Sequence, residues 1–438
     1  MFCGRELALP CEVSDVGTAR IVFDRWGERY ADCISAVRSS AVRDLFAAAS
    51  RPDMISFSGG MPAVDLVPAA AVANAAHDAV IHEGTAALQY GGSDGRPQIR
   101  ALVAELMAEI GVRLKPADLL ITAGAQQALD LLAKTFLNPG DVVITEGPTY
   151  VGALQAFSAY RPDIHCIEMD DDGMRMDLLE AELERLGPRG AKFIYTIPNF
   201  QNPGGVTMSP ERRRRLLELA REYDIPVVED DPYGRLRFDG GHMKPLRSLD
   251  EEVIYLGTFS KIFAPGLRLG WITAPAPILA KVLLVKQAAD LCGSNFAQVT
   301  AERYFQGTRW RRTLQELTRT YAERRDAMLA ALDEHFPPEA RWSRPEGGFF
   351  VWVELPAYVD CAAMLAEAVE RGVTYAPGDG FFPDGRGRNC MRLAFCYASP
   401  ASIAEGIERL SEVIEDRLEL YRAFIAAGAL PAPDAGAA

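Results

Sequence analysis

The sequence has no long hydrophobic run and no basic leader. No segment of its 438 residues reaches the roughly 18 uninterrupted apolar residues of a membrane span. The first residues, MFCGRELALPCEVSD, lack the basic stretch and apolar run of a signal peptide. These absences argue against a membrane protein and predict a location in the cytoplasm.

Paired metal and disulfide motifs are missing as well. The eight cysteines include no C-x-x-C pair, and the five histidines show no H-x-x-x-H or H-E-x-x-H spacing. We therefore expect neither a disulfide framework nor a metal site. Positive charge is in deficit, because 46 lysines and arginines face 60 acidic residues and leave a net charge of −14. That balance argues against nucleic acid or an anionic membrane as a partner.

Apolar runs alternate with amphipathic stretches through the first two thirds of the chain. Continuous apolar runs that are each followed by a helix predict an α/β fold with a largely parallel sheet covered on both faces. The chain is long for one core, so we expect two domains. The expected strands are residues 119–122, 142–145, 192–197, 225–228 and 253–256.

Later in the chain the pattern changes to long helices beside a few strands, which predicts a smaller α+β domain. An N-terminal arm and its first helix are expected to join that domain. The predicted division is 1–50 for this arm and helix, 51–290 for a large domain, 291–426 for the C-terminal small domain and 427–438 for a disordered tail.

Polar residues fall just beyond the ends of the expected strands, at the rim where open α/β sheets bind ligands. The turn at Ala123-Gly124-Ala125 leads into a helix, whose first N–H groups favour an anion. The glycines Gly59 and Gly60 suit either a close approach to a bulky group or a simple turn. The rim residues are Gly124, Ala125, Gln126, Tyr150, Asn202, Asp230, Tyr233, Ser260 and Lys261.

The segment 252–272, EVIYLGTFSKIFAPGLRLGWI, carries the strongest chemical signal. Lys261 follows a buried strand, where loss of solvent lowers the pKa of the amine and frees it to attack a carbonyl. The hydroxyls of Thr258 and Ser260 and the guanidinium of Arg268 suit a phosphate. Pyridoxal phosphate carries an aldehyde and a phosphate on one ring, so this cofactor is predicted.

Further motifs are spread between residues 43 and 410: ISFSGGMP, LQYGGSDG, TAGAQQALDL, EGPTY, IPNFQNPGG, VVEDDPY, LGTFSK, APGLRLG, PEGGFFVW and MRLAF. Together they resemble the class I and II aminotransferases of fold type I, and within these the 2-aminoadipate, kynurenine and aromatic aminotransferase group. The resemblance implies a large domain with a mostly parallel seven-stranded sheet flanked by helices, together with a small α+β domain.

The resemblance also implies roles for individual residues. Lys261 matches the lysine that forms a Schiff base with the cofactor and moves the proton between substrate and cofactor. Asp230 matches the carboxylate that pairs with the pyridine nitrogen, and Tyr150 the ring that stacks on the cofactor. Asn202 and Tyr233 match donors to the 3-oxygen. The implied phosphate site comprises the turn at Gly124, the amides of Ala125 and Gln126, and the side chains of Thr258, Ser260 and Arg268.

Two further matches concern the substrate and the subunit. Arg392 corresponds to the arginine that binds the substrate carboxylate with two forked nitrogens, beside Asn202 and Gly60. Tyr90 matches a tyrosine that reaches the phosphate of the neighbouring subunit, which implies a homodimer with shared active sites. The implied reaction is a ping-pong transfer of an amino group from an amino acid to a 2-oxo acid.

The chain departs from the family pattern at two positions. Ala125 stands where the family commonly has serine, which removes one hydroxyl from the phosphate site. Ala36 stands where the aminoadipate enzymes carry an arginine for a distal carboxylate, and Arg38 lies two residues away as a candidate substrate contact. The first departure bears on the affinity for the phosphate, whereas the second favours a neutral, aromatic or basic amino acid as substrate and fits a specialised biosynthetic pathway.

Two alternatives stay open. Related folds decarboxylate, cleave or oxidise amino acids with the same cofactor, and the motifs do not distinguish these outcomes. Ligand-sensing regulators on this fold form the second alternative, but they carry a DNA-binding domain ahead of the fold. The residues before position 43 contain no basic recognition helix.

Overall fold

The computed structural model describes residues 12–13, 20–21, 24–37 and 53–427. The first amphipathic helix, expected around Val42 and Leu45, lies outside these ranges, as do Arg38 and residues 428–438 of the tail expected over 427–438.

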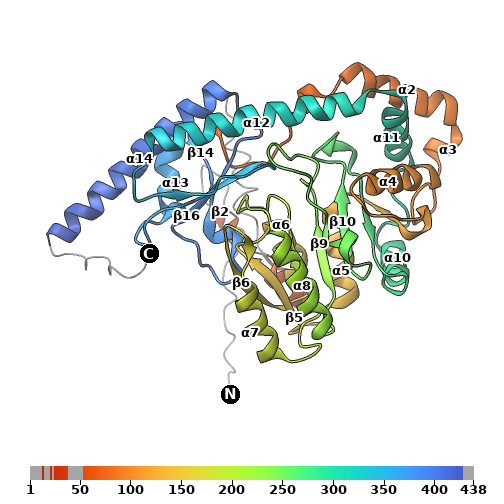
Figure 1. The fold of residues 1–438 in the computed structure, drawn as a ribbon, viewed down its shortest axis with the longest axis horizontal. Coiled ribbons are helices and arrows are strands. Elements are labelled where there is room, and N and C mark those ends of the chain that lie inside the picture. Colours follow the sequence, from red (N-terminus) through yellow and green to blue (C-terminus); the bar gives the residue numbers. More distant parts are fainter. Residues whose placement is uncertain (1–11, 14–19, 22–23, 38–52, 428–438) are drawn as a thin grey trace.

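The central sheet contains eight strands, which are β4 (Leu120–Thr122), β5 (Val142–Gly147), β6 (Asp163–Asp170), β7 (Gly173–Met174), β8 (Phe193–Thr196), β9 (Val227–Asp230), β10 (Ile254–Thr258) and β11 (Gly270–Thr273). Their order is β4-β11-β10-β9-β8-β5-β6-β7 (Figure 1). Pairing is parallel from β10 to β6, whereas β11 runs against β10 and β4, and β7 against β6. The mostly parallel sheet is as predicted, and the short β7 is one strand more than the seven expected.

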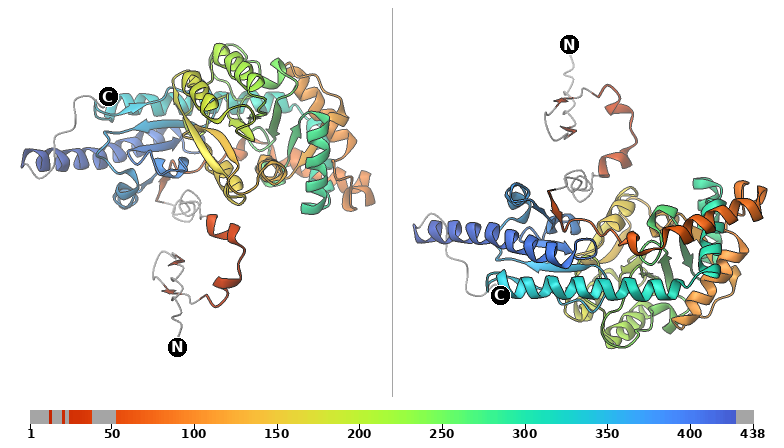
Figure 2. Two further views of the ribbon diagram at one scale, coloured as in Figure 1. Left: turned by 90° about the horizontal axis from the view of Figure 1, so that it is seen from below. Right: turned by 90° about the horizontal axis from the view of Figure 1, so that it is seen from above.

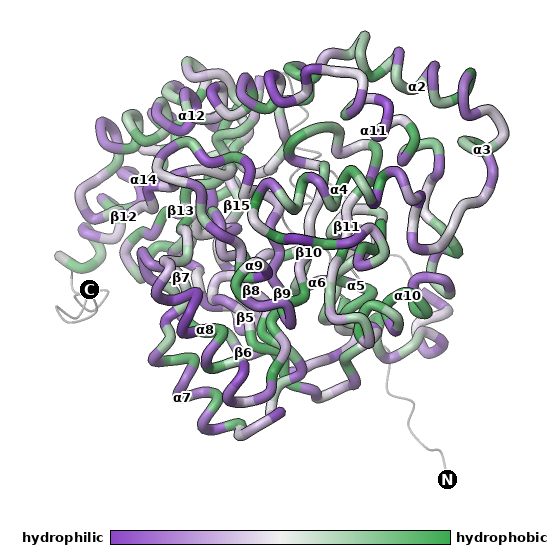
Figure 3. The backbone as a smooth tube through the Cα atoms, turned by 45° about the vertical axis from the view of Figure 1, so that its right-hand side comes forward, coloured by the Kyte–Doolittle hydropathy of each residue, from purple (hydrophilic) through white to green (hydrophobic). Residues whose placement is uncertain are grey.

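Helices cover both faces of this sheet, namely α5 (Ala125–Phe136), α6 (Val151–Ser158) and α10 (Ala276–Asp290) on one face, and α7 (Met176–Leu186), α8 (Pro210–Glu222) and α9 (Leu246–Leu249) on the other. Neighbouring strand residues alternate between two hydrophobic clusters: Val143 packs under the first set and Ile144 under the second. Hydrophobic and hydrophilic stretches alternate along α7 and α8 (Figure 3). Burial on both faces explains why the strands are continuously apolar.

A smaller sheet lies in the C-terminal region, in the order β12 (Arg341–Trp342), β13 (Phe350–Glu354), β16 (Cys390–Ala394) and β15 (Ala376–Pro377). The long helices α12 (Trp310–His335) and α14 (Pro400–Ala426) lie side by side there (Figure 1). α13 (Cys361–Glu370) precedes β14 (Val373–Thr374), which pairs in parallel with β3 (Ile55–Ser56). Residues just after the N-terminal segment therefore belong to the C-terminal region in space.

Four helices gather at the opposite end of α12: α2 (Ala69–Glu83), α3 (Thr85–Leu88), α4 (Pro97–Glu109) and α11 (Asn295–Gly307) (Figure 1). One hydrophobic cluster includes Ile99 of α4 and Met391 of β16, so it joins this part to the smaller sheet. The predicted boundary at residue 290 coincides with the end of α10. The division into domains itself stays a prediction.

The described N-terminal residues lie at the edge of the molecule (Figure 2). The strands β1 (Glu12–Val13) and β2 (Arg20–Ile21) pair with each other in antiparallel fashion, and Asp32 pairs with Arg161 at 3.6 Å. Within the described ranges, no helix is long and apolar enough to cross a membrane.

Candidate active site

The carboxyl ends of β4, β8, β9 and β10 meet at one edge of the central sheet, beside a cavity of about 390 Å³. Twelve predicted site residues line it: Gly60, Ala125, Gln126, Tyr150, Asn202, Asp230, Tyr233, Thr258, Ser260, Lys261, Arg268 and Arg392. Val151, Gly152, Gln155, Ile197, Pro232, Pro265 and Phe350 complete the lining. The rim position that the strand pattern predicted therefore does bring these residues together.

Lys261 lies on the turn that follows β10. Its Nζ donates a hydrogen bond of 2.9 Å to the carbonyl of Gly60 and lies 5.4 Å from the centre of the Phe349 ring. Burial, with the nearby cations of Arg392 and Arg268, lowers the pKa of Lys261 to about 8. About a tenth of this amine is therefore unprotonated at pH 7, far more than for an ordinary lysine, and the unprotonated form is the one that attacks a carbonyl.

Asp230 ends β9 and is buried, with 3% of its surface exposed. The hydroxyl of Tyr195, on the neighbouring β8, donates to Asp230 Oδ2 at 2.9 Å. The other oxygen, Oδ1, is buried and has no hydrogen-bond partner among the described residues. Burial, aided by repulsion from Asp231 and Glu146, raises the pKa of Asp230 to about 7. One half of this carboxylate is thus held by the protein, and the other half is available to a ligand that brings a proton or a positive charge.

Arg392, on β16, is the only arginine of the cavity that is buried. Its Nη1 donates to Asn202 Oδ1 at 2.9 Å and its Nη2 to the carbonyl of Ser58 at 2.6 Å. The guanidinium lies near two aromatic rings, 4.2 Å from the centre of Phe350 and 4.9 Å from that of Phe381. Among the described residues no carboxylate lies within ion-pair distance of it, and burial lowers its pKa to about 10. A buried guanidinium without a counter-ion is suited to receive the carboxylate of a ligand.

A different set of groups surrounds the start of α5. The helix begins at Ala125 without a side-chain cap, after Gly124 at φ +79°. The positive φ favours glycine here, and a Cβ on Gly124 would lie 2.4 Å from Arg268 Nη2, so the end of the arginine side chain would have to move. Thr258 Oγ1 donates to Ser260 Oγ at 3.0 Å, and Arg268 Nη1 lies 3.5 Å from the same oxygen. Helix N–H groups, two hydroxyls and an arginine are together suited to bind an anion.

Tyr150 lies immediately before α6 and lines the cavity beside these groups. Its hydroxyl donates to Gln126 Oε1 at 3.3 Å, and Gln126 Nε2 donates to the carbonyl of Gly152 at 2.6 Å. A Cβ on Gly152 would lie 2.4 Å from Cζ of the Tyr150 ring, so the glycine allows the ring to approach the start of α6 closely. The ring thus has a hydrogen-bond partner at its hydroxyl and a close neighbour at Gly152.

Three predicted residues are not in the cavity lining. Gly124 lies directly behind Arg268, as just described. Tyr90 lies on the loop between α3 and α4, with 77% of its surface exposed. Arg38 lies outside the described residues, and Ala36 closes a 3₁₀ turn (Asp32–Ala36) whose relation to the substrate stays a prediction.

Several residues of the site were missed by the sequence reasoning. Tyr195, the partner of Asp230, sits in a strand whose other residues are apolar or small, and an isolated tyrosine in such a strand was the only available signal. Phe350 lies inside the motif PEGGFFVW, but its contact with Arg392 joins positions on two strands. Phe381 and Gln155 belong to no motif that the sequence singled out.

The whole sequence was compared with known proteins. Residues 52–410 match the family described as Aminotransferase class I and II. The chain is 45% identical to an aromatic-amino-acid aminotransferase of Thermococcus litoralis over 87% of this chain and 93% of that protein. Similar solved structures include a kynurenine aminotransferase of Pyrococcus horikoshii (TM-score 0.85, 44% identity, 89% of this chain and 98% of the other). Another is an alpha-aminoadipate aminotransferase of Thermus thermophilus (TM-score 0.84, 37% identity, 90% and 99%).

These similarities confirm the predicted family, fold type and cofactor. The solved structures that resemble this chain were determined in complex with pyridoxamine phosphate in the Pyrococcus case and with a phosphopyridoxyl-leucine in the Thermus case. The chain thus belongs to the class I and II aminotransferases, enzymes that use pyridoxal phosphate.

Proposed function

We propose that this protein transfers the amino group of a neutral or aromatic L-amino acid to a 2-oxo acid in a ping-pong cycle. The observation that carries the proposal is the combination, in one cavity, of an amine with a lowered pKa, a half-satisfied buried carboxylate and an unpaired buried guanidinium. These groups belong to Lys261, Asp230 and Arg392.

The cavity fits pyridoxal phosphate at both of its ends. The unpartnered Oδ1 of Asp230 suits a protonated ring nitrogen, and the uncapped start of α5 with Arg268 suits the phosphate. Asn202 and Tyr233 are assigned to the 3-oxygen, and Tyr150 to the face of the ring. When bound, the cofactor supplies an aldehyde that accepts amino groups and a ring that withdraws electrons from the substrate.

Lys261 is assigned the proton transfer. In its unprotonated form it takes the proton from the α-carbon of the amino acid, and in its protonated form it returns a proton. A pKa of about 8 places both forms within reach near neutral pH. The bond to Gly60 and the Phe349 ring hold the side chain in the cavity.

Arg392 is assigned the substrate α-carboxylate. Hydrogen bonds to Asn202 and Ser58 hold two of its nitrogens, and the nearby rings of Phe350 and Phe381 pack against the guanidinium. A planar fork held this way orients the substrate, which fixes the α-carbon relative to Lys261.

The lining favours substrates without a second carboxylate. The charged residues of the lining are Asp230, Lys261, Arg268 and Arg392, all of which already have assignments in the proposal. The remaining walls are apolar, aromatic or uncharged, as in Tyr150, Ile197 and Phe350. The similarity to an aromatic-amino-acid aminotransferase supports the same class of substrate.

A homodimer is part of the proposal. Tyr90 is exposed, and so are Leu88 of α3, Ile81 of α2, Leu291 directly after α10 and Phe296 at the start of α11. Large exposed apolar groups of this kind mark an interface, and a second copy of the chain would let Tyr90 contribute to the neighbouring cavity. We keep the cytoplasm as the location, since the six described cysteines are unpaired.

The test is the visible spectrum of the purified protein with single amino acids and no oxo acid. We expect phenylalanine or tyrosine to remove the visible band of the bound cofactor and to release the matching oxo acid, while 2-aminoadipate acts weakly. Release of carbon dioxide or of a side-chain fragment, without conversion of the cofactor to its amine form, would replace transamination by another reaction. A strong response to 2-aminoadipate alone would overturn the substrate class.

A further inference from the structure

The loop between α3 and α4 carries Tyr90. The first residues of this loop are hydrogen-bonded to the start of α11. The side-chain amide of Asn295, the first residue of α11, donates from Nδ2 to the carbonyl of Gln89 at 2.9 Å and to that of Ala86 at 3.3 Å. Both acceptors are backbone groups within four residues of Tyr90. One side chain thus fixes the backbone on which Tyr90 stands.

Asn295 also lies against the residue that follows Tyr90. A Cβ on Gly91 would lie 2.2 Å from Asn295 Oδ1, so a glycine is needed for the approach. This oxygen is buried and has no hydrogen-bond partner among the described residues. The reversed amide would bring its oxygen against two carbonyls, so the orientation is set by the two bonds of its nitrogen. The side chain of Asn295 therefore makes its hydrogen bonds to the backbone beside Tyr90 and not within α11.

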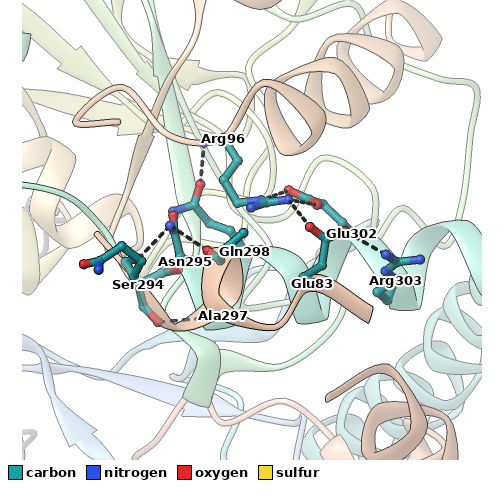
Figure 4. Close-up of polar contacts among 10 residues, drawn as sticks. Glu83, Arg96, Ser294, Asn295, Ala297, Gln298, Glu302 and Arg303 are labelled. Carbon is teal, nitrogen blue, oxygen red and sulfur yellow. Dashed lines mark hydrogen bonds and ion pairs between the residues drawn. The ribbon is translucent and has the colours of Figure 1, made fainter. Parts of the chain in front are cut away.

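The end of the same loop is fastened to α11 by charged groups (Figure 4). The backbone N–H of Arg96 donates to Gln298 Oε1 at 2.8 Å, and Arg96 Nε pairs with Glu302 at 3.0 Å. Glu83, from the end of α2, accepts from Arg96 at 3.4 Å and from Arg303 at 2.7 Å. Most of this network is withdrawn from solvent, and breaking such a network is costly.

Tyr90 lies between these two fastenings and points outward. The loop backbone is held within the chain, whereas the Tyr90 side chain is 77% exposed. A fixed backbone under an exposed side chain lowers the entropy lost when that side chain meets a partner.

We propose that Asn295 is a positioning residue for the cofactor phosphate of a second copy of this chain, acting through Tyr90. The inference rests on the proposed function, because it needs the dimer and the contact of Tyr90 with the neighbouring phosphate. Asn295 touches neither cofactor nor substrate. It holds the loop in one conformation, so that less conformational entropy is lost when the Tyr90 hydroxyl contacts the phosphate.

The experiment compares the affinity of the apoenzyme for pyridoxal phosphate with its affinity for pyridoxal, which lacks the phosphate. The variants are Tyr90→Phe, Asn295→Ala, Asn295→Asp and the double variant Tyr90→Phe/Asn295→Ala. Gln306→Ala, an exposed position on the same helix, is the matched control. Binding is followed by the absorption of the bound ligand, and the dimer by sedimentation.

We expect Tyr90→Phe to weaken the binding of pyridoxal phosphate roughly tenfold, the effect of one hydrogen bond to a charged acceptor. Asn295→Ala should weaken it roughly threefold to tenfold, and Asn295→Asp at least as much, since a carboxylate would face two carbonyls. Affinity for pyridoxal should change in none of them. In the double variant, the loss of Asn295 should add little to the loss of the Tyr90 hydroxyl.

The possible results distinguish the positioning role of Asn295 from the role of Tyr90 in the proposed function. If Tyr90→Phe binds pyridoxal phosphate as well as the unaltered protein does, the role of Tyr90 in the proposed function is wrong. If Tyr90→Phe is impaired but Asn295→Ala is not, the positioning role is wrong and the function stands. Equal losses for pyridoxal and pyridoxal phosphate, or additive losses in the double variant, would show a general structural role and also overturn the inference. Should Asn295→Asp fail to form a dimer, Asn295→Ala decides.

Discussion

The two ends of the cavity differ in how much of their structure one chain supplies. At the end near Asp230 and Arg392, both charged side chains are 3% exposed and each is held by neutral donors or acceptors of the same chain. At the end near α5, Arg268 is exposed, and its bonds to Ser260 and to the carbonyl of Ala123 are long, at 3.5 and 3.3 Å. The side chains of Asp230 and Arg392 are therefore held in place by the protein alone. Arg268 is held only by long hydrogen bonds, so its N–H groups remain available to a ligand.

This contrast separates two kinds of effect. Groups fixed in a buried place can act on the energy of a reaction, because they need not reorganise during it. Groups at an open, solvated place act mainly on how tightly a ligand is held. Changes at the Asp230 end should therefore lower kcat, and changes at the α5 end should lower the affinity for the cofactor.

Replacing Lys261 is expected to have the largest effect. Lys261→Ala removes the amine to which we assign the proton transfer, so kcat should fall by roughly a thousandfold or more. Thermal unfolding should show an intact fold. The exposed Lys281 offers a matched control, since Lys281→Ala removes an amine far from the cavity lining. Undiminished turnover in Lys261→Ala would end the assignment of this residue.

Asp230→Ala tests the buried end directly. The variant removes the only carboxylate of the lining, and kcat should fall by more than roughly a hundredfold because the charge that supports electron withdrawal is lost. Tyr195→Phe should cost much less, since the carboxylate remains. The comparison is made by steady-state kinetics at saturating cofactor. A rate near that of the unaltered protein in Asp230→Ala would contradict the ring-nitrogen role.

Arg392→Lys keeps the charge and removes the fork. The KM for the amino acid should rise roughly tenfold to a hundredfold, because an ammonium group makes one contact where the guanidinium makes two. Arg388→Lys, at an exposed arginine on the loop before β16, serves as the control. If Arg392→Lys raises the KM for the amino acid no more than Arg388→Lys does, the substrate carboxylate is bound by another residue.

Much of the cavity lining, at both ends, could be predicted from the sequence, for a physical reason. Apolar strands in a parallel sheet end at one edge, so Asp230 and Lys261 had to be neighbours once the strands were recognised. Thr258, Ser260 and Arg268 followed from their closeness in the chain to Lys261. The family motifs then supplied Arg392, whose distance along the chain no strand rule could bridge.

What the sequence left out are contacts between distant positions that carry no motif. Tyr195 reaches Asp230 across neighbouring strands, and the register that aligns them depends on the whole sheet. Phe381 packs on Arg392 from a turn of the smaller region. Asn295 holds a loop some 200 positions earlier, so its role appears only when α11 is seen beside α3. Local patterns predict which elements form, and packing decides which side chains meet.

Arg268→Lys tests the open end. We expect the affinity for pyridoxal phosphate to fall roughly threefold to tenfold, with kcat near normal once the cofactor is saturating, because hydroxyls and helix N–H groups remain. Measured Kd and kcat in the same preparation distinguish the ends. A large fall in kcat with unchanged affinity for pyridoxal phosphate would contradict the proposed difference between the α5 end and the Asp230 end.

The smallest effect concerns the stability of the apoprotein. Asp230 has a pKa of about 7 in the folded chain, above its ordinary value of 3.8, because it is buried. The folded state therefore holds this proton more tightly than the unfolded state between these pH values, and folding loses that advantage as the pH rises toward 7. Urea unfolding at pH 5, 6 and 7 should show the unaltered apoprotein losing on the order of 1 kcal/mol per pH unit relative to Asp230→Asn. Asp171→Asn, at an exposed position, should not change the slope. If the free energy of unfolding changes with pH in the same way for Asp230→Asn and the unaltered protein, the carboxylate is already charged at pH 5. Solvent would then reach Asp230 more readily than its burial indicates.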